Sequence, residues 1–385
     1  MKVLVSQKVE GIAGAETYLI SLLPALKAKG IQVEFLLFFP TGKWEKAKKF
    51  EEIIKGSGVT VHSLAVNRIP TFFQLKKIHH IIRFGEYDIV HSNLLPADIT
   101  FAVIKLLFNK KMVLVSGKHG YEDEYTNLYG FNPSKKTKNF YWYCAWVAEK
   151  FINRSFVISS GLFTLYTGLG ISKKKRLELI HYGFDFKEDY QINQDFQLGN
   201  PQLVIVGRLI AFKGHRYAIE ALKKLVPKYP DIQLVIVGWG ELKEKLQYMA
   251  KEMDLEKHVV FTGFNQNPRE IMFNSDIVLL PSVSEGFGIV VLEAMSVKRP
   301  VVAFKVPSPS EIFIHNETGL LATPYSVEEY TSLIERLIEN PDYRKEIAEN
   351  AYRKLKDYYN LSRMISQTIG FYERALGKHE KRSSV

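Results

Sequence analysis

The sequence predicts an α/β protein built from two doubly wound domains. Short apolar runs alternate with longer segments of helical periodicity, and the alternation starts again at residue 201. Strands that are apolar throughout and are separated by helices are typical of parallel sheets covered on both faces. The length of 385 residues also favours two domains, because single cores seldom grow beyond about 300 residues.

The first domain is predicted over residues 1–190. It begins with the apolar strand "KVLVS" at 2–6, and the helical segment over 15–30 closes on a glycine, where helices often end. The other elements expected in this half are a strand at 33–39, a helix over 43–58, and strand-to-loop units at 87–93, 112–120 and 155–161.

The second domain is predicted over residues 200–360. The stretch 186–201 separates it from the first domain, because it is polar and aperiodic and ends in Asn-Pro, as linkers often do. Its expected strands lie within 202–209, 232–240, 258–264, 276–282 and 300–304.

The composition restricts the partners of the protein. A net charge of +11 suits a phosphate-bearing substrate, an anionic membrane surface or nucleic acid. Nucleic acid is the least favoured, because no zinc-finger spacing, RNP-type aromatic pattern or basic heptad region occurs. The single cysteine, Cys144, fits a reducing compartment such as the cytoplasm. No apolar run reaches the length of a membrane span, and the N-terminus reads as a strand rather than a signal peptide.

Ligands of open parallel sheets bind beyond the carboxyl ends of the strands, and with two domains we expect them in the cleft between these domains. In the second half one strand end carries Gly207, Arg208 and Lys213, and another leads into "PSVSEGFGIVVLEAM" at 281–295. A planar guanidinium, an ammonium group and the backbone amides of a glycine-rich helix start are groups that bind a diphosphate.

Two carboxylates, Glu285 and Glu293, stand in the same stretch and would repel an anion. The conflict disappears if they accept hydrogen bonds from hydroxyl groups, since a vicinal diol can satisfy both carboxylate oxygens. A ligand with a diphosphate between two polyhydroxyl rings is a nucleotide sugar, so we expect Glu293 at the ribose and Glu285 at the sugar. Taken singly, each glutamate would be an ordinary helix-start or surface residue.

The strand ends of the first half are less specific. Gly11 and Gly14 in "GIAGAE" predict a turn before a helix, but the third glycine of a dinucleotide-binding fingerprint is missing. His91 and His119 follow two further strands, where each would also serve as a hydrogen-bonded loop residue. The acidic stretch 122–124 is better explained as a solvated loop than as a metal site.

The motifs of the second half resemble those of the retaining glycosyltransferases of family 4, which have the GT-B fold of two Rossmann-like domains facing a central cleft. The resemblance covers nearly the whole chain and is looser in the first half, where "GIAGAE", "VHSN", "KHG" and "LELIHYGFD" correspond. In the second half it rests on 207–222, on 235–241, on "FTGF" at 261–264, and on a pair of glutamates separated by seven residues within 276–295.

The resemblance implies an enzyme that moves a hexose from a UDP- or GDP-sugar to a glycan or lipid-linked acceptor in cell-surface polysaccharide, lipopolysaccharide or glycolipid synthesis. Configuration would be retained, without a metal ion or another cofactor. Retention would come from same-face attack or from a covalent intermediate, and we favour same-face attack because the sequence shows no clear nucleophile. Arg208 and Lys213 would bind the diphosphate and Glu293 the ribose, while Glu285 and His119 would lie at the reacting sugar. The other residues that the resemblance places at the donor are Gly14, Gly207, Gly238, Phe264, Gly286, Phe287 and Gly288.

Some features depart from the family pattern or leave alternatives open. Pro307 to Glu311 reads "PSPSE" where the family often has Gly-Gly before a proline and a glutamate, and Lys298 or Arg299 replaces a common glycine. These departures concern the shape of the sugar pocket. A non-catalytic nucleotide-sugar or glycan-binding subunit, or another GT-B enzyme such as a sugar-nucleotide epimerase, is an alternative function. The C-terminal helix, at about 361–376, is expected to return to the first domain.

The segment 134–154 interleaves lysines with aromatic residues, including Trp142 and Trp146. This pattern suits peripheral contact with the inner face of an anionic membrane, and a buried helix of the first domain would explain it equally well. "KKKR" at 173–176 belongs to the same basic half and is more typical of a solvated turn.

Overall fold

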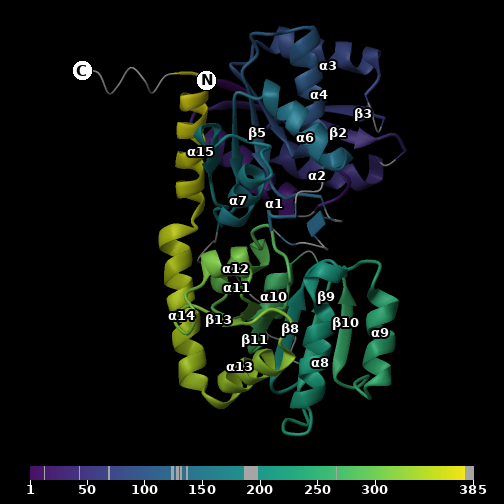
Figure 1. Ribbon diagram of the computed structural model, residues 1–385, viewed down its shortest axis with the longest axis vertical. Coiled ribbons are helices and arrows are strands. Elements are labelled where there is room, and N and C mark those ends of the chain that lie inside the picture. The colour runs from purple at the N-terminus through teal and green to yellow at the C-terminus, as the bar shows by residue number, and fades with distance from the viewer. Residues whose placement is uncertain are drawn as a thin grey trace, which may run out of the picture. The chain divides into compact units, whose positions relative to one another are not determined.

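The computed structural model describes residues 1–377 except 13, 43, 68–69, 123–124, 127–129, 131, 136–137, 186–197 and 266. The chain forms two compact units (Figure 1). The first unit comprises Met1–Glu122, Asn132–Gly183 and Leu361–Val385, and the second comprises Asp123–Phe131 and Phe184–Asn360. Most of the predicted linker lies outside the described residues.

The first unit contains a parallel sheet of seven strands in the order β3-β2-β1-β4-β5-β6-β7. The predicted strands of this half are all present, whereas the two outermost strands were not predicted. The strands are β1 (Lys2–Lys8), β2 (Gln32–Pro40), β3 (Thr60–Val66), β4 (Ile89–Asn93), β5 (Leu114–Lys118), β6 (Arg154–Val157) and β7 (Leu177–Leu179).

Seven α-helices are described in the first unit, with the C-terminal helix α15 among them. Thr71 and Gln74 form a reciprocal capping box that begins α3. On α15, Phe371 packs its ring edge against Phe156 with ring centres 5.4 Å apart, and the helix contacts α1. The helices are α1 (Gly14–Ala28), α2 (Trp44–Gly56), α3 (Phe72–Gly85), α4 (Leu94–Leu107), α6 (Phe140–Phe151), α7 (Ser160–Gly168) and α15 (Leu361–Ala375).

The second unit contains a parallel sheet of six strands in the order β10-β9-β8-β11-β12-β13. Five of these strands match the predicted positions, and β13 was not predicted. The strands are β8 (Gln202–Val206), β9 (Gln233–Val237), β10 (Val259–Gly263), β11 (Ile277–Leu280), β12 (Val301–Phe304) and β13 (Leu320–Ala322). The helices are α8 (His215–Leu225), α9 (Lys243–Glu252), α10 (Pro268–Phe273), α11 (Ile289–Ser296), α12 (Pro307–Ile312), α13 (Val327–Glu339) and α14 (Pro341–Tyr358).

The order of the strands determines where a ligand can bind. In each sheet the chain first adds strands on one side and then crosses to the other, so the order reverses next to β1 in the first unit and next to β8 in the second. Ligands of doubly wound sheets bind at such a reversal, beyond the carboxyl ends of the strands. In the second unit this location lies between the loops that follow β8 and β11.

Candidate active site

The loops after β8 and β11 lie against each other. The backbone N–H of Val283 donates to the carbonyl of Phe212 at 2.9 Å. Gly214 has a left-handed backbone with φ of 71°, and a Cβ atom built on it would lie 1.9 Å from the carbonyl oxygen of Pro281. Only glycine fits this position, because any side chain would push the two loops apart.

The loop after β9 joins the same arrangement. A Cβ atom on Gly238, whose φ is 148°, would lie 1.9 Å from the carbonyl oxygen of Gly207. The Leu209 N–H donates to the Trp239 carbonyl at 2.8 Å. The "VGWGE" stretch is therefore more than a strand-to-helix turn, since it supports the backbone that carries Arg208.

Arg208 and Lys213 lie beside one buried aromatic ring, that of Phe212. The Arg208 guanidinium carbon and the Lys213 ammonium nitrogen are each 5.9 Å from its centre. Arg208 is exposed, whereas the Lys213 side chain is only 16% exposed. The structure thus brings the two predicted phosphate-binding cations together.

Lys213 forms an ion pair with Glu285, with 2.6 Å between Nζ and Oε2. The Glu285 side chain is 8% exposed, so this is a charge-assisted hydrogen bond with little competition from water. Glu285 was predicted to accept hydrogen bonds from sugar hydroxyls. In this structure it accepts one from Lys213, a residue that was predicted to bind the diphosphate. The pair neutralises the charge that would otherwise repel an anion.

Helix α11 begins directly after the predicted glycine-rich bend. Gly288, with a left-handed φ of 82°, precedes its first residue. Phe287 is buried, its carbonyl accepts a hydrogen bond from the Ser308 hydroxyl at 2.5 Å, and its ring contacts Tyr359. The side chain of Phe287 therefore anchors the loop, and the chain at Gly286 to Gly288 can meet a ligand only through its backbone.

Glu293 lies in the second turn of α11 and is half-buried. Burial raises the pKa of its carboxyl group to about 7, and the positive charge of Arg269 partly opposes this rise. A carboxyl group that changes ionisation near neutral pH is a candidate functional group, because a surface glutamate would be ionised throughout this range.

Two aromatic side chains stand exposed in the loops that follow β9 and β10. Trp239 is 61% exposed and Phe264 is 57% exposed. Exposed rings beyond the carboxyl ends of adjacent strands can stack on a planar base. Phe264 was among the predicted donor residues and Trp239 was not, although its position between two glycines was a usable signal.

His119 lies in the first unit, and both of its ring nitrogens have partners. The Tyr182 hydroxyl is 2.7 Å from Nδ1, and the Asn93 side-chain oxygen is 2.7 Å from Nε2. The pKa of His119 is lowered to about 3, by burial and then by the charges of His91 and Lys118. His119 stays a predicted sugar contact, and such a contact would replace one of these two bonds.

The residue before His119 belongs to a buried ionic cluster. The Lys118 ammonium group lies 2.6 Å from Asp98 and 3.2 Å from Glu149, and all three side chains are buried. Burial raises the pKa of Asp98, while Lys118 opposes the rise. This cluster fixes the end of β5 and hence the position of His119.

Two candidate residues of the first unit remain, Gly14 and His91, and the structure places them differently: Gly14 is exposed and His91 is buried. Gly14 is the exposed first residue of α1, as expected for a helix start that faces a ligand. His91 is buried and its Nδ1 lies 2.7 Å from the Tyr372 hydroxyl, which joins β4 to α15. The structure therefore favours the structural explanation of His91.

The segment 134–154 is partly internal and partly exposed. The indole N–H of Trp142 donates to the Leu169 carbonyl at 3.0 Å, and Ala145 and Ala148 of α6 are buried. Phe140 and Tyr143 are 82% and 58% exposed. No helix among the described residues is long and apolar enough to span a membrane.

Within the described ranges no group of three histidine, cysteine or acidic residues could hold a metal ion. Of the acidic stretch 122–124, the last two residues lie outside those ranges.

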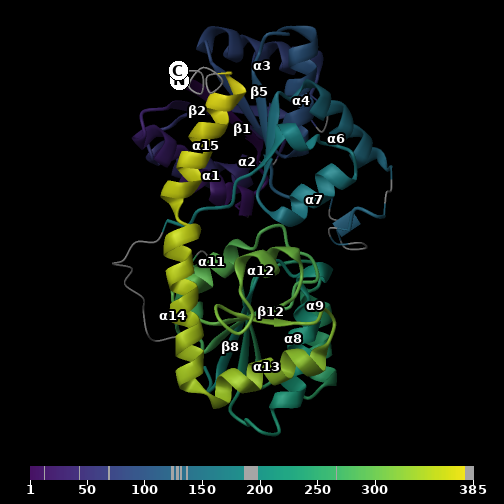
Figure 2. The ribbon, with the colours of Figure 1, turned by 60° about the vertical axis from the view of Figure 1, so that its left-hand side comes forward.

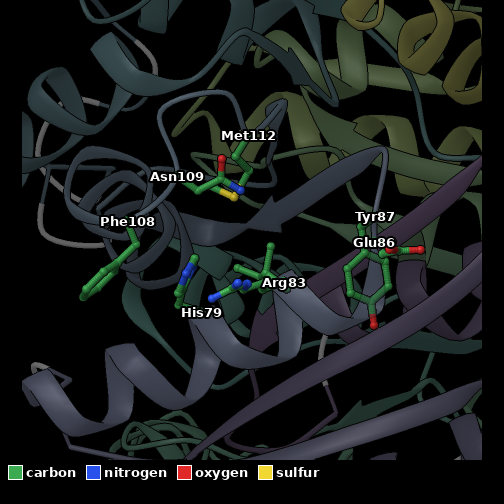
Figure 3. Close-up of a pocket in the computed structure, with 8 residues that line it drawn as sticks. His79, Arg83, Glu86, Tyr87, Phe108, Asn109 and Met112 are labelled. Atoms are coloured by element: carbon green, nitrogen blue, oxygen red, sulfur yellow. The ribbon is translucent and has the colours of Figure 1, made fainter.

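A pocket of about 420 Å³ lies in the first unit, away from the strand ends that bind ligands (Figure 3). It lies beside α3, and its lining includes Tyr87, two residues before β4, and Met112, two residues before β5. This is the amino-terminal edge of the sheet, so the pocket is distinct from the candidate active site. It is lined by His79, Ile82, Arg83, Glu86, Tyr87, Phe108, Asn109 and Met112.

Comparison with known families covers most of the chain. Residues 12–188 match the model of Glycosyltransferase Family 4, and residues 186–354 match that of Glycosyl transferases group 1. The chain belongs to glycosyltransferase family 4. The predicted fold class is likewise confirmed, because the two parallel sheets form a GT-B fold.

The relatives of this chain include several named glycosyltransferases. The alpha-D-kanosaminyltransferase of Streptomyces kanamyceticus is 35% identical over 45% of this chain and 45% of its own length. The O-antigen biosynthesis glycosyltransferase WclY of Escherichia coli is 24% identical over 78% of this chain and 83% of its own. Four of the curated relatives are 28% to 35% identical to the chain, and the chain spans about half the length of each.

A solved structure resembles this chain over nearly its whole length. Anabaena HepE, crystallised in complex with UDP-glucose, has a TM-score of 0.80 and 21% identity, and the match covers 97% of this chain and all of HepE. At this identity the likeness shows the fold alone.

Replacing Gly214 with alanine should destabilise the glycosyltransferase by about 3 kcal/mol or more, because strain and overlap with the Pro281 carbonyl add together. Gly263 is the matched control, since it has a similar φ of 75° and no atom lies within 4 Å of the position that a Cβ would take. Gly263→Ala should cost only the left-handed strain, about 1 kcal/mol. Urea unfolding followed by circular dichroism measures both values, and equal losses would contradict the proposed contact.

Proposed function

We propose that the glycosyltransferase moves a hexose from a UDP- or GDP-sugar to a glycan or lipid-linked acceptor. The observation that carries the proposal is the ion pair of Lys213 and Glu285 next to Arg208, at the strand-order reversal of the second sheet. These groups can receive a diphosphate and a hydroxylated ring at neighbouring positions. Support from relatives comes from HepE, whose crystals contain UDP-glucose, and from WclY, which is an O-antigen enzyme.

Arg208 and Lys213 supply the positive charge that the leaving diphosphate needs. Negative charge grows on the diphosphate as the bond from the sugar C1 breaks, and cations close to it stabilise that charge. The amino-terminal end of α11 adds its partial positive charge. In this mechanism Lys213 turns from Glu285 toward the phosphate, and Glu285 is then free to accept hydrogen bonds from the sugar.

The nucleoside is held by the residues around α11 and the next strand ends. Glu293 accepts hydrogen bonds from the ribose diol, and Trp239 and Phe264 offer rings on which a base can stack. The backbone at Gly286 to Gly288 contacts the donor directly, since no side chain intervenes there. Gly207 and Gly238 keep the loop that carries Arg208 close to the donor.

Transfer proceeds with retained configuration and without a metal ion. The bond between C1 and the diphosphate breaks as the acceptor oxygen bonds to the same face of C1, through an oxocarbenium-like state. The acceptor hydroxyl proton passes to an oxygen of the departing diphosphate. We favour this route over a covalent intermediate because the sequence shows no clear nucleophile.

We assign the reaction to the cytoplasm and to the synthesis of surface polysaccharide, lipopolysaccharide or glycolipid. The O-antigen relative supports this assignment. In the first unit, Gly14 and the neutral His119 are the residues assigned to the acceptor side and to the reacting sugar.

The direct test is a panel of nucleotide sugars. Thermal shift and calorimetry with UDP-glucose, UDP-N-acetylglucosamine and GDP-mannose should show binding of at least one donor. Release of UDP or GDP with an acceptor glycan, and ¹H NMR of the new anomeric proton, should show transfer with retention. Failure of every UDP- and GDP-sugar to bind contradicts the proposal, and binding without any turnover indicates a non-catalytic subunit.

Glu293 should make the affinity for UDP-glucose depend on pH. A carboxyl pKa of about 7 leaves Glu293 mostly protonated at pH 6 and mostly ionised at pH 8. The ionised form is the better acceptor for a ribose diol, so the dissociation constant should fall by about tenfold or less over this range. UDP-glucose suits calorimetry because its diphosphate diester does not titrate there.

Glu293→Gln is the matched variant for this measurement, since it keeps the shape and removes the titration. Its affinity for UDP-glucose should be lower at pH 8 and nearly constant with pH. The folded state of the wild type binds the extra proton between pH 4.5 and about 7, so its stability should fall with rising pH relative to Glu293→Gln. If the affinity of both proteins for UDP-glucose changed with pH in the same way, the assignment of Glu293 to the ribose would be wrong.

Variants of the ion pair separate its catalytic function from its structural one. Lys213→Ala leaves Glu285 buried and unpaired, so it should lose about 2–4 kcal/mol of stability and at least about 100-fold in kcat/KM. Adding Glu285→Ala removes the unpaired charge and should restore stability, but turnover should stay low. Melting temperature and donor turnover are measured on all variants. Recovery of turnover in the double variant would show that the pair is structural only.

A further inference from the structure

Three helices of the first unit form a layer over one face of its sheet. Helix α4 packs against both α3 and α6, and the apolar sides of α3 and α4 share a core with the strands. In both views α3, α4 and α6 lie next to one another, away from α15 (Figures 1 and 2). We refer to α3, α4, α6 and the connection 108–112 as the outer layer.

The outer layer carries a concentration of exposed apolar side chains. Among the described residues, seven of the fifteen large hydrophobic side chains that stand exposed belong to it. Phe73 and Phe140 are each 82% exposed and Phe84 is 70% exposed. The seven are Phe72, Phe73, Phe84, Leu106, Leu107, Phe140 and Tyr143. Exposed apolar surface gathered in one place indicates an interaction site.

Helix α3 has a partly apolar outward face in addition to the apolar side that faces the core. Phe73, Lys77, His80 and Phe84 are spaced by four, three and four residues, so they share one face. The His80 and Phe84 rings lie 4.1 Å apart on it. The core-facing side is made by Leu75, Ile78 and Ile82. The helix therefore has a second partly apolar face, which its own fold does not cover.

The exposed charges within the outer layer are positive, although the exposed acid Glu86 directly follows α3. Among the described residues of the outer layer, the acids are Asp98 and Glu149, and both are buried beside Lys118. The helix α3 itself contains no acid, and Glu86 follows as its C-terminal cap. The exposed cations of the layer and of the residue that flanks α6 are Lys76, Lys77, Arg83, Lys110, Lys111, Lys138 and Lys150.

Several cations stand directly beside exposed or half-buried rings. Lys150 lies 3.3 Å from the centre of the Trp146 ring, and Lys76 lies 4.8 Å from that of Phe72. Side chains paired in this way place a ring at the acyl boundary of a bilayer and an ammonium group at the phosphates. Protein interfaces are depleted in lysine, so the composition favours a bilayer over a protein partner.

We propose that the outer layer of the first unit docks on an anionic lipid bilayer. Phe73, Phe84 and Phe140 enter the interface, and the lysines around them bind lipid phosphates. The pocket beside α3 lies at the edge of this layer, with His79 and Arg83 on one side and Glu86 and Tyr87 on the other (Figure 3). Its lining combines the cation Arg83 and the acid Glu86 with apolar and aromatic residues. The proposed docking surface includes α3 and α4 in addition to the aromatic and basic segment 134–154, which contains α6.

Vesicle flotation of the full chain tests the proposal. Wild-type protein should float with vesicles of phosphatidylglycerol and phosphatidylcholine and should bind phosphatidylcholine alone at least about tenfold less. Phe73→Ser/Phe84→Ser should weaken binding to the anionic vesicles at least about tenfold. The matched control, Ile53→Ser/Tyr248→Ser, changes two exposed apolar residues outside the layer and should bind as the wild type does.

A second pair of variants tests the charge. Lys76→Glu/Lys77→Glu/Lys111→Glu should abolish flotation, whereas Lys173→Glu/Lys174→Glu/Lys175→Glu has the same net charge and should retain it. Unchanged melting temperature and UDP-sugar binding would show that each variant is folded. The proposal is overturned if wild-type protein ignores anionic vesicles, if both charge variants lose binding equally, or if the aromatic variant only loses self-association in ultracentrifugation.

Discussion

The ion pair between Lys213 and Glu285 is the interaction on which the candidate site depends. Its two side chains belong to loops that follow β8 and β11, and these loops can touch because Gly214 presents no side chain to the Pro281 carbonyl. Without Lys213, Glu285 would be a buried unpaired carboxylate, which costs several kcal/mol and would repel a diphosphate. With it, a positively charged site can keep an acid ready for hydroxyl groups.

Most of the fold could be predicted because central parallel strands are buried on both faces and are therefore apolar throughout. The strands that were missed all lie at sheet edges. The residues of β3, Thr60–Val66, include exposed positions, and β7 and β13 have only three residues each. A short or half-exposed edge strand leaves no apolar run long enough to recognise.

The site was predictable to the extent that parallel sheets bring the ends of their strands to one edge. From the sequence alone, this rule predicts that Arg208, Lys213 and Glu285 lie near one another. It could not reveal which side chains would pair, because Lys213 and Glu285 are 72 residues apart in the chain and meet only through loop packing. The partners of His119 were hidden for the same reason, since Tyr182 is 63 residues away.

The proposals give the net charge of +11 two purposes in different places. At the candidate active site, two cations and one paired carboxylate leave a local excess of about one charge for a diphosphate. On the outer layer, the cations surround rings such as Phe73 and Phe84, whose exposure to water is unfavourable. A bilayer would cover those rings and confine the enzyme to a surface, where lipid-linked acceptors have a high effective concentration. The proposed docking would therefore favour a lipid-linked acceptor over a free glycan.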